Sequence, residues 1–319
     1  MICMSKPPKI GDAEISDSHH SDYHTPVLLQ EVIVGLDIKP GGTYVDCTFG
    51  GGGHSRAILQ KLGDTGKLVV FDQDEAARKN LPEDDRILFI RQNFRHLQKF
   101  LRVHKTTQVD GILADLGVSS HQFDEAARGF STRFDAALDM RMDQRQELTA
   151  AEILNKYPEQ QLHKLFEKFG EVTNSKTLAK CICEQRLVAP LKTINQFKQA
   201  VSQVVKGNPN KYFAQVFQAL RIEVNEEIRS LEEMLQQSLE VLKPGGRIAI
   251  ITFHSLEDRI VKTFFRQGSF EEEPESDFFG RKKESPFLII TRKPVVAATA
   301  ELRNNPRSRS AKLRIASKK

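Results

Sequence analysis

The feature with the clearest chemical meaning is a run of four glycines, Gly50 to Gly53, inside the segment DCTFGGGGHS. The run follows a β-branched apolar stretch and precedes an amphipathic one, so it lies where a strand passes into a helix. Glycine adopts positive φ without strain and lets a ligand approach the backbone closely. In an open α/β sheet this turn is the usual binding crevice. The run predicts a ligand-binding loop; a merely flexible loop is the alternative.

A carboxylate at the end of the next apolar run indicates which kind of ligand binds. Asp72 ends KLVVFD about twenty residues after the glycines, where an acid can bind the two hydroxyls of a ribose. The dinucleotide fingerprint G-x-G-x-x-G lacks its third glycine, and no GxxxxGK[ST] loop exists. A mononucleoside such as S-adenosyl-L-methionine fits what remains. We expect Phe94, after the third apolar run, to lie on its adenine face, with a position in the core as the alternative.

A second carboxylate, Asp115, ends the fourth apolar run, VDGILADLG. An acid at the carboxyl end of this strand faces the crevice in which a transferred group would lie. Asp115 is therefore the residue expected nearest the chemistry. The alternative is a turn aspartate that bonds its own backbone, which is common before Gly and Ser.

The elements that position these residues alternate along the chain. Apolar runs at 43–49, 67–72, 87–92 and 109–117 read as strands, and the segments near 55–62, 75–81 and 95–104 read as helices. Short strands separated by helical segments of about ten residues are typical of βαβ units and a parallel sheet.

The alternation stops between residues 123 and 212, where apolar residues recur only at helical spacing. Asn174 and Thr193 are expected N-caps, and Gly170 and Gly207 expected helix ends. A long helix is then predicted over 213–242, followed by strands at 247–254, 287–295 and 311–317. We infer an α/β domain made of residues 23–122 and 213–319, interrupted by an all-helical insertion at 123–212. Residues 1–22 are expected to form a disordered tail.

Composition excludes several classes of protein. Of the 319 residues, 39% are hydrophobic and 28% charged, which rules out wholesale disorder. No apolar stretch approaches the roughly 18 to 20 residues of a membrane span, and the first residues do not resemble a secretory signal. The four cysteines form no CxxC pair, which argues against a zinc site and a disulfide scaffold. We expect a cytoplasmic protein with no metal and no membrane partner.

Positive charge is concentrated in two segments, although the net charge is only +5. Residues 141–212 carry twelve lysines and arginines against seven acids, and residues 303–319 carry seven cations and no acid. This pattern favours a polyanionic partner that contacts the protein at two places, because neutralisation of phosphates by lysine and arginine dominates nucleic-acid affinity. For the middle segment alone, an ordinary solvated helical surface is an equal alternative.

The longer motifs resemble one family. HTPVLLQEV, DCTFGGGGHS, FDQD, DGILADLGVSS, RGFS, LDMRMD, FQALRIEVNEE, LKPGGRIAIITFHSLEDRIVK and NPRSRSAKLRIA are similar to segments of the 16S ribosomal RNA (cytosine-N4)-methyltransferase H family, also called MraW. The resemblance runs from about His24 to the C-terminus. It implies a class I, Rossmann-like methyltransferase that uses S-adenosyl-L-methionine. Its implied substrate is N4 of a decoding-centre cytidine, which also carries a 2′-O-methyl group, in 16S rRNA within the small ribosomal subunit.

The resemblance also implies which residues contact the cofactor. The residues that stand at the family's cofactor-contact positions are Gly52, Gly53, His54, Asp72, Phe94, Asp115 and Gln122.

Methyl transfer to an amine requires a lone pair in line with the methyl–sulfur bond, at about 3 to 3.5 Å. The N4 lone pair of cytosine is delocalised, so acceptors for its N–H groups would assist attack. Asp115 is one catalytic candidate, and His254 is the second. Because the target base must leave its stack, basic side chains are expected to hold the flanking RNA. The proposed RNA contacts are Arg128, Arg133, Arg141, Arg307 and Arg309.

Two other classes of function stay open at this level. A nicotinamide-dependent oxidoreductase is opposed by the incomplete fingerprint. A non-catalytic RNA-binding assembly factor is opposed by the intact Asp72 and Asp115. The sequence does not determine the oligomeric state, and a homodimer stays open.

Overall fold

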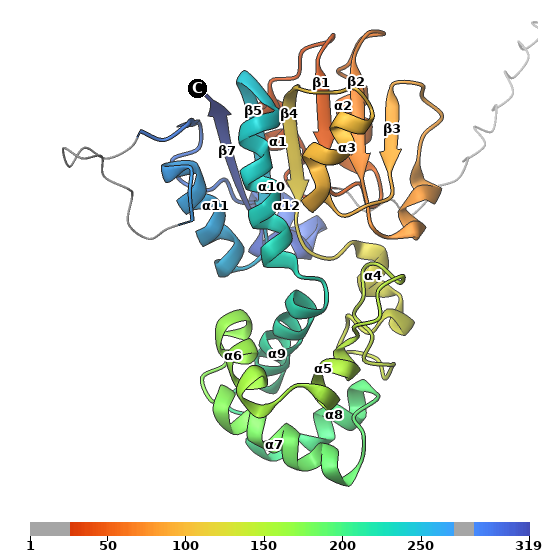
Figure 1. The fold of residues 1–319 in the computed structure, drawn as a ribbon, viewed down its shortest axis with the longest axis vertical. Coiled ribbons are helices and arrows are strands. Elements are labelled where there is room, and N and C mark those ends of the chain that lie inside the picture. Colours follow the sequence, from red (N-terminus) through yellow and green to blue (C-terminus); the bar gives the residue numbers. More distant parts are fainter. Residues whose placement is uncertain (1–25, 271–283) are drawn as a thin grey trace, which may run out of the picture.

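The computed structural model describes residues 26–270 and 284–319, so the expected N-terminal tail lies outside the described residues. A sheet with helices on both faces forms one part of the molecule, and a helical part lies below one end of its strands (Figure 1). This arrangement is the predicted α/β fold with an all-helical insertion.

The sheet has the strand order β3-β2-β1-β4-β5-β7-β6. The first five strands in that order are parallel, and β7 runs antiparallel to both β5 and β6. The strands are β1 (Thr43–Asp46), β2 (Lys67–Phe71), β3 (Ile87–Ile90), β4 (Val109–Asp115), β5 (Leu242–Thr252), β6 (Phe287–Ile289) and β7 (Lys312–Lys318). The strand predicted over 287–295 is wrong in its second half: beyond β6, only Val295 forms a bridge, to Leu313.

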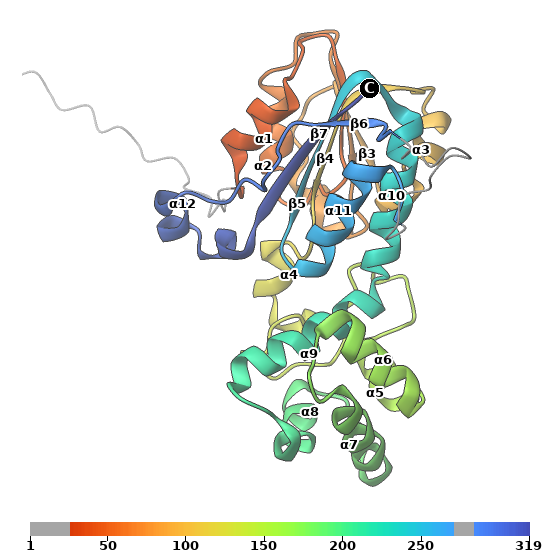
Figure 2. The same ribbon diagram turned by 90° about the vertical axis from the view of Figure 1, so that its left-hand side faces the viewer.

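Helices cover both faces of the sheet (Figure 2). Because side chains alternate along a strand, Val45 and Ile112 join one core while Tyr44 and Leu113 join the other. The first core includes α3 (Leu97–Val103), α10 (Glu227–Val241) and α11 (Ser255–Gln267), and the second includes α1 (Leu29–Leu36) and α2 (Gly53–Leu59). Shorter elements are the 3₁₀ helices η1 (Glu75–Asn80), η2 (Phe94–His96) and η5 (Pro306–Ser310), and α12 (Thr299–Asn304).

The insertion has its own apolar core. Its elements are α4 (Ser120–Asp124), η3 (Ala126–Arg128), α5 (Ala150–Lys156), α6 (Glu159–Gly170), α7 (Ser175–Val188), α8 (Ile194–Ala200), η4 (Ser202–Val204) and α9 (Pro209–Val224). Thr193 forms the predicted cap, as a full capping box with Gln196. Asn174 precedes α7 as predicted, but its side-chain amide donates to the Val204 carbonyl instead of capping the helix.

The long helix predicted over 213–242 is two helices. It breaks after α9, where Glu226 has a left-handed φ of 47° before α10 begins. The Asn225 side chain accepts from the Met142 amide and donates to the Met140 carbonyl, which ties the break to a distant loop. Since α9 packs in the insertion core and α10 against the sheet, the insertion ends near residue 225, and the boundary predicted at residue 212 is wrong.

Candidate active site

A cavity of about 530 Å³ lies at the carboxyl ends of β1, β2 and β4, between the sheet and the start of the insertion. This volume is within the range of pockets that bind drug-sized ligands. Most of the predicted cofactor residues line it: Gly53, His54, Asp72, Phe94, Asp115 and Gln122. The parallel strands bring these residues together because their carboxyl ends meet at one edge of the sheet.

The four glycines of the loop have different structural roles. Gly50 and Gly52 have φ of 49° and 74°, which only glycine adopts readily. A Cβ on Gly52 would lie 2.9 Å from the Phe49 ring, and one on Gly53 2.2 Å from Pro26 Cγ. A Cβ on Gly51 would meet no described atom within 4 Å. Gly51 therefore offers the open backbone surface for a ligand. Gly52, predicted as a contact, does not line the cavity and shapes the turn.

Asp72 connects the end of β2 to the glycine loop. Its Oδ2 accepts from the Gly50 amide and its Oδ1 from the Asp74 amide, each at 2.8 Å. Burial raises the pKa of Asp72 to about 7, against the lowering effect of these two hydrogen bonds. The carboxylate keeps further lone pairs, and because Asp72 lines the cavity, these are available to ligand hydroxyls.

The backbone amide of Asp115 is hydrogen-bonded, whereas one oxygen of its carboxylate has no hydrogen-bond partner among the described residues. Its amide donates to Thr48 Oγ1 at 2.7 Å. Its Oδ2 lies 3.7 Å from His54 Nδ1, and its Oδ1 has no hydrogen-bond partner among the described residues. Burial, followed by the charges of Asp46 and Glu257, raises the pKa of Asp115 to about 8. A cationic ligand would relieve this crowding of negative charge.

The His54 ring, predicted as a cofactor contact, is 6% exposed and directed at protein groups. Its Nε2 lies 3.0 Å from the Val27 carbonyl oxygen, so we assign the ring proton to Nε2 and leave Nδ1 facing Asp115. Burial lowers the pKa of His54. The side chain therefore packs under the loop, bonded to the Val27 carbonyl.

Gln122 and Arg128 meet on one carboxylate, that of Asp74. The Gln122 amide donates to Asp74 Oδ2 at 2.8 Å, and its oxygen accepts from the Ser119 amide. The Arg128 Nη1 lies 2.8 Å from the same Asp74 oxygen, while its Nη2 donates to the carbonyls of Arg141 and Met142. Arg128 is 6% exposed. Its predicted RNA contact is therefore corrected: Arg128 fastens the insertion loop to the cavity wall.

Replacing Arg128 by alanine is expected to destabilise the protein by about 3 to 5 kcal/mol, because it leaves the buried Asp74 carboxylate without its cation. The two carbonyls that Arg128 binds would lose their donor as well. Urea unfolding of the full chain measures the change. Arg133→Ala, at an exposed position, is the control, and equal stability of both variants would contradict this role.

The other predicted arginines differ in their environments. Arg141 makes a bidentate pair with Asp139 and donates to the Gln146 carbonyl, so it too is engaged within the protein. Arg133 and Arg309 are exposed. Arg307 lines the cavity, pairs with Asp124 at 2.6 Å and lies over the Phe123 ring. The guanidinium of Arg133 also lies over Phe123.

Phe94 begins η2 and lines the cavity half-buried, as its predicted adenine contact requires. It is positioned by Asn93, whose side-chain oxygen accepts from the Arg95 amide and whose amide donates to Gln73. The adenine contact stays a prediction.

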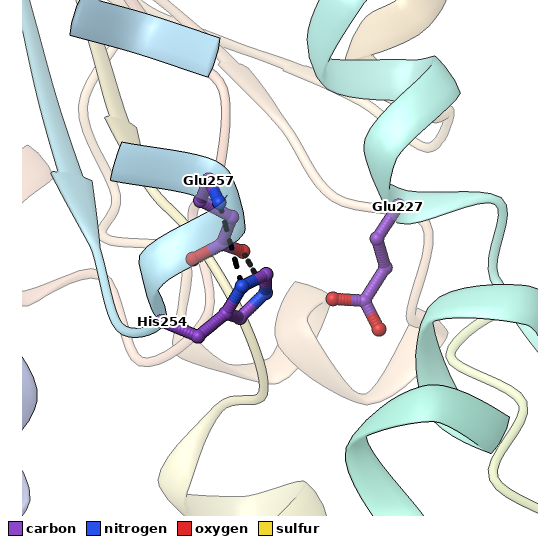
Figure 3. A group of neighbouring side chains, drawn as sticks. All are labelled: Glu227, His254 and Glu257. Carbon is purple, nitrogen blue, oxygen red and sulfur yellow. Dashed lines mark hydrogen bonds and ion pairs between the residues drawn. The ribbon is translucent and has the colours of Figure 1, made fainter. Parts of the chain in front are cut away.

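His254 does not reach the cavity wall, whereas its neighbour Glu257 does. His254 caps α11, and its Nε2 lies 3.1 Å from Glu257 Oε1. Figure 3 shows the Glu227 carboxylate pointing toward this pair from α10. Potential metal-ligating atoms of all three lie within 4.8 Å of one another. Glu227 and Glu257 were not predicted, since the sequence pattern did not show that α10 and α11 begin facing each other.

Comparison with known proteins agrees with this geometry. The family model described as the MraW methylase family matches residues 21–319. A protein from Bacteroides thetaiotaomicron named ribosomal RNA small subunit methyltransferase H is 53% identical over 298 residues, covering 93% of this chain and 98% of its own. One of the same name from Flavobacterium johnsoniae has the same identity and coverage.

Among solved structures, an rRNA methylase from Streptococcus thermophilus aligns with a TM-score of 0.37 at 12% identity, covering 91% of this chain and 92% of its own. Within residues 26–270 and 284–319, no helix combines the length and the apolar character needed to cross a membrane.

The glycine loop, the two strand-end aspartates and a family match that spans nearly the whole chain agree on one cofactor, S-adenosyl-L-methionine. The chain is therefore a methyltransferase and belongs to the MraW methylase family.

Proposed function

We propose that this protein transfers a methyl group from S-adenosyl-L-methionine to N4 of a decoding-centre cytidine of 16S rRNA, within the small ribosomal subunit. The names of its relatives, more than half identical over nearly their full length, support an rRNA substrate. The motifs that resemble the (cytosine-N4)-methyltransferase family support the base and the position. Such a substrate would place the enzyme in the cytoplasm.

The proposal rests on a difference between the two ends of the cavity: one suits a nucleoside and the other is acidic. One end has the open Gly51 backbone, Asp72 and the half-buried Phe94, which fits a nucleoside. The other end has Asp115 with an unpartnered oxygen, beside Glu257. An acidic end suits a sulfonium and an amine that becomes positive as it is methylated.

When bound, S-adenosyl-L-methionine supplies an electrophilic methyl group on a positively charged sulfur. Asp115 would accept a hydrogen bond from the attacking amine, stabilise its developing charge and take up the N4 proton. The hydrogen bond from the Asp115 amide to Thr48 Oγ1 holds this residue at the end of β4. His254, predicted as a second catalytic group, would act through Glu257, because the ring does not line the cavity.

RNA would approach along the surface on which the insertion and the C-terminal segment meet the cavity. Arg133 and Arg309 are exposed, and Arg307 lies at the cavity itself. These three arginines are the proposed RNA contacts. Their cations would neutralise phosphates on the strand that flanks the extruded base.

The affinity for S-adenosyl-L-methionine is expected to rise by up to about tenfold per pH unit and to level off above about pH 8. Below the Asp115 pKa of about 8, the free protein holds a proton on that carboxyl group. A sulfonium beside it favours the ionised form, so binding must release the proton.

Calorimetry from pH 6 to pH 9 measures this dependence. The demethylated product has a neutral sulfur and should show a smaller slope, whereas Asp72, with its pKa of about 7, affects both ligands alike. Identical slopes for the two ligands would contradict the placement of Asp115 beside the sulfur.

The reaction itself is tested by mass spectrometry of 16S rRNA nucleosides from a deletion strain. Loss of the N4-methyl group from the doubly modified cytidine, restored by the wild-type gene, is the expected result. An unchanged nucleoside profile would reject the proposed substrate and favour a non-catalytic role in assembly.

A further inference from the structure

The first turn of α10 presents two polar side chains to the cavity, and none of the roles described above accounts for them. Glu227 begins the helix and Ser230 follows three residues later, on the same helix face. Both line the cavity. Ser230 is 1% exposed, yet its Oγ has no hydrogen-bond partner among the residues that the structure describes. Buried polar atoms normally have partners, so an orphaned hydroxyl at a cavity wall indicates a ligand.

The Glu227 carboxylate is fixed in place. Arg221 donates to both of its oxygens, from Nε at 2.8 Å and from Nη2 at 3.0 Å. The Glu227 side chain is only 10% exposed. Each carboxylate oxygen keeps a lone pair beyond the one that Arg221 uses. Because the break at Glu226 sets where α10 starts, the junction with the insertion determines the position of Glu227.

A second fixed carboxylate faces it from α11. Glu257 is 2% exposed, its Oε2 accepts from the Phe253 amide, and its Oε1 lies next to the His254 ring. In Figure 3 Glu227 points across the gap toward the Glu257–His254 pair. Asp115 is close enough to Glu257 for the charge of Glu257 to affect it. Carboxylates from β4, α10 and α11, those of Asp115, Glu227 and Glu257, thus line the same cavity.

A cavity wall made of carboxylates favours ligands that offer hydrogen-bond donors. The exocyclic amine of cytosine offers two N–H donors, and it becomes positive as it accepts a methyl group. Uracil has a carbonyl oxygen at the same position, and carboxylates would repel it. A divalent metal ion could use the same oxygens and imidazole, but it would place two positive charges beside the sulfonium.

We propose that Glu227 accepts a hydrogen bond from the exocyclic amine of the target cytosine, opposite Asp115, and that Glu227 and Glu257 exclude uracil. Ser230 would supply a further polar contact to the base. This inference rests on the proposed cytidine substrate and names the residues that recognise it.

The test compares Glu227→Gln with Glu226→Gln, its neighbour in sequence. Glu226 is half-exposed and pairs with Arg95 outside the cavity, which makes it a matched control. Single-turnover methyl transfer to small subunits from the deletion strain should fall about 10- to 100-fold in Glu227→Gln, the effect of weakening one charged hydrogen bond. Glu226→Gln should stay within twofold of the wild type. Glu227→Asp should recover part of the rate.

Affinity for S-adenosyl-L-homocysteine, measured by calorimetry, reports whether the fold and the cofactor end are intact, and it should change less than twofold in all three variants. A wild-type rate in Glu227→Gln, or an equal loss of product affinity, would overturn the base contact. So would zinc bound by the wild type and absent from Glu227→Gln, with activity lost to a chelator and restored by zinc. If the wild type methylates no small subunit, the proposed function fails instead.

Discussion

Replacing Asp115 by asparagine is expected to lower the single-turnover rate of methyl transfer about 1,000-fold. Asparagine has nearly the same shape but no negative charge, and its NH₂ group is a hydrogen-bond donor where aspartate has an acceptor oxygen. It would therefore neither stabilise the positive charge that develops on the attacking nitrogen nor accept its proton. The rate is measured with saturating S-adenosyl-L-methionine and small subunits that lack the modification.

The same variant should bind S-adenosyl-L-homocysteine as well as the wild type and be at least as stable. Burial and the charges of Asp46 and Glu257 raise the pKa of Asp115 to about 8. An acid with a raised folded-state pKa reduces stability as pH rises above its unfolded value near 3.9, so replacing this ionisable group by a neutral amide relieves that cost at neutral pH. A variant that keeps its rate would show that another group accepts the proton. A variant that loses stability would show a structural role instead.

Replacing Asp72 by asparagine is expected to weaken the binding of both S-adenosyl-L-methionine and S-adenosyl-L-homocysteine about 100-fold. The carboxylate accepts from two backbone amides, those of Gly50 and Asp74. An asparagine can satisfy one of them, and its own amide group would then face the other donor. The glycine loop would lose its attachment to β2, and the ribose would lose a charged acceptor.

Calorimetry with both ligands measures this loss, and Asp85→Asn, at an exposed position, serves as the control. Equal losses for the two ligands are expected because the ribose is common to both. A loss restricted to the methylated donor would mean that Asp72 senses the sulfonium charge and does not bind the sugar. Unchanged affinity for both would remove Asp72 from the site.

The binding end of the site could be predicted from the sequence because its signals are local. A glycine run after a strand and an aspartate at the end of each neighbouring strand converge in any parallel sheet, whatever the rest of the chain does. For this reason Asp72 and Asp115 line the cavity as predicted. The helical insertion was predictable for the same reason, since periodicity is a property of short segments.

The partners of individual side chains could not be predicted in this way. Arg128 was predicted as an RNA contact because basic side chains were expected to hold the flanking RNA, but a buried Asp74 from another segment binds it. The break between α9 and α10 depends on hydrogen bonds from Asn225 to a loop more than 80 residues earlier in the chain. The break leaves Glu227 as the first residue of α10, and from there it points toward Glu257 (Figure 3).

Local pattern thus determined which strands end in chemically active residues, and where the chain turns from sheet to helices. Tertiary packing decided which charged groups are neutralised inside the protein and which stay available to a ligand. The physical reason is that burial and electrostatic partners depend on elements far apart in sequence, whereas strand ends and helical periodicity depend on neighbouring residues.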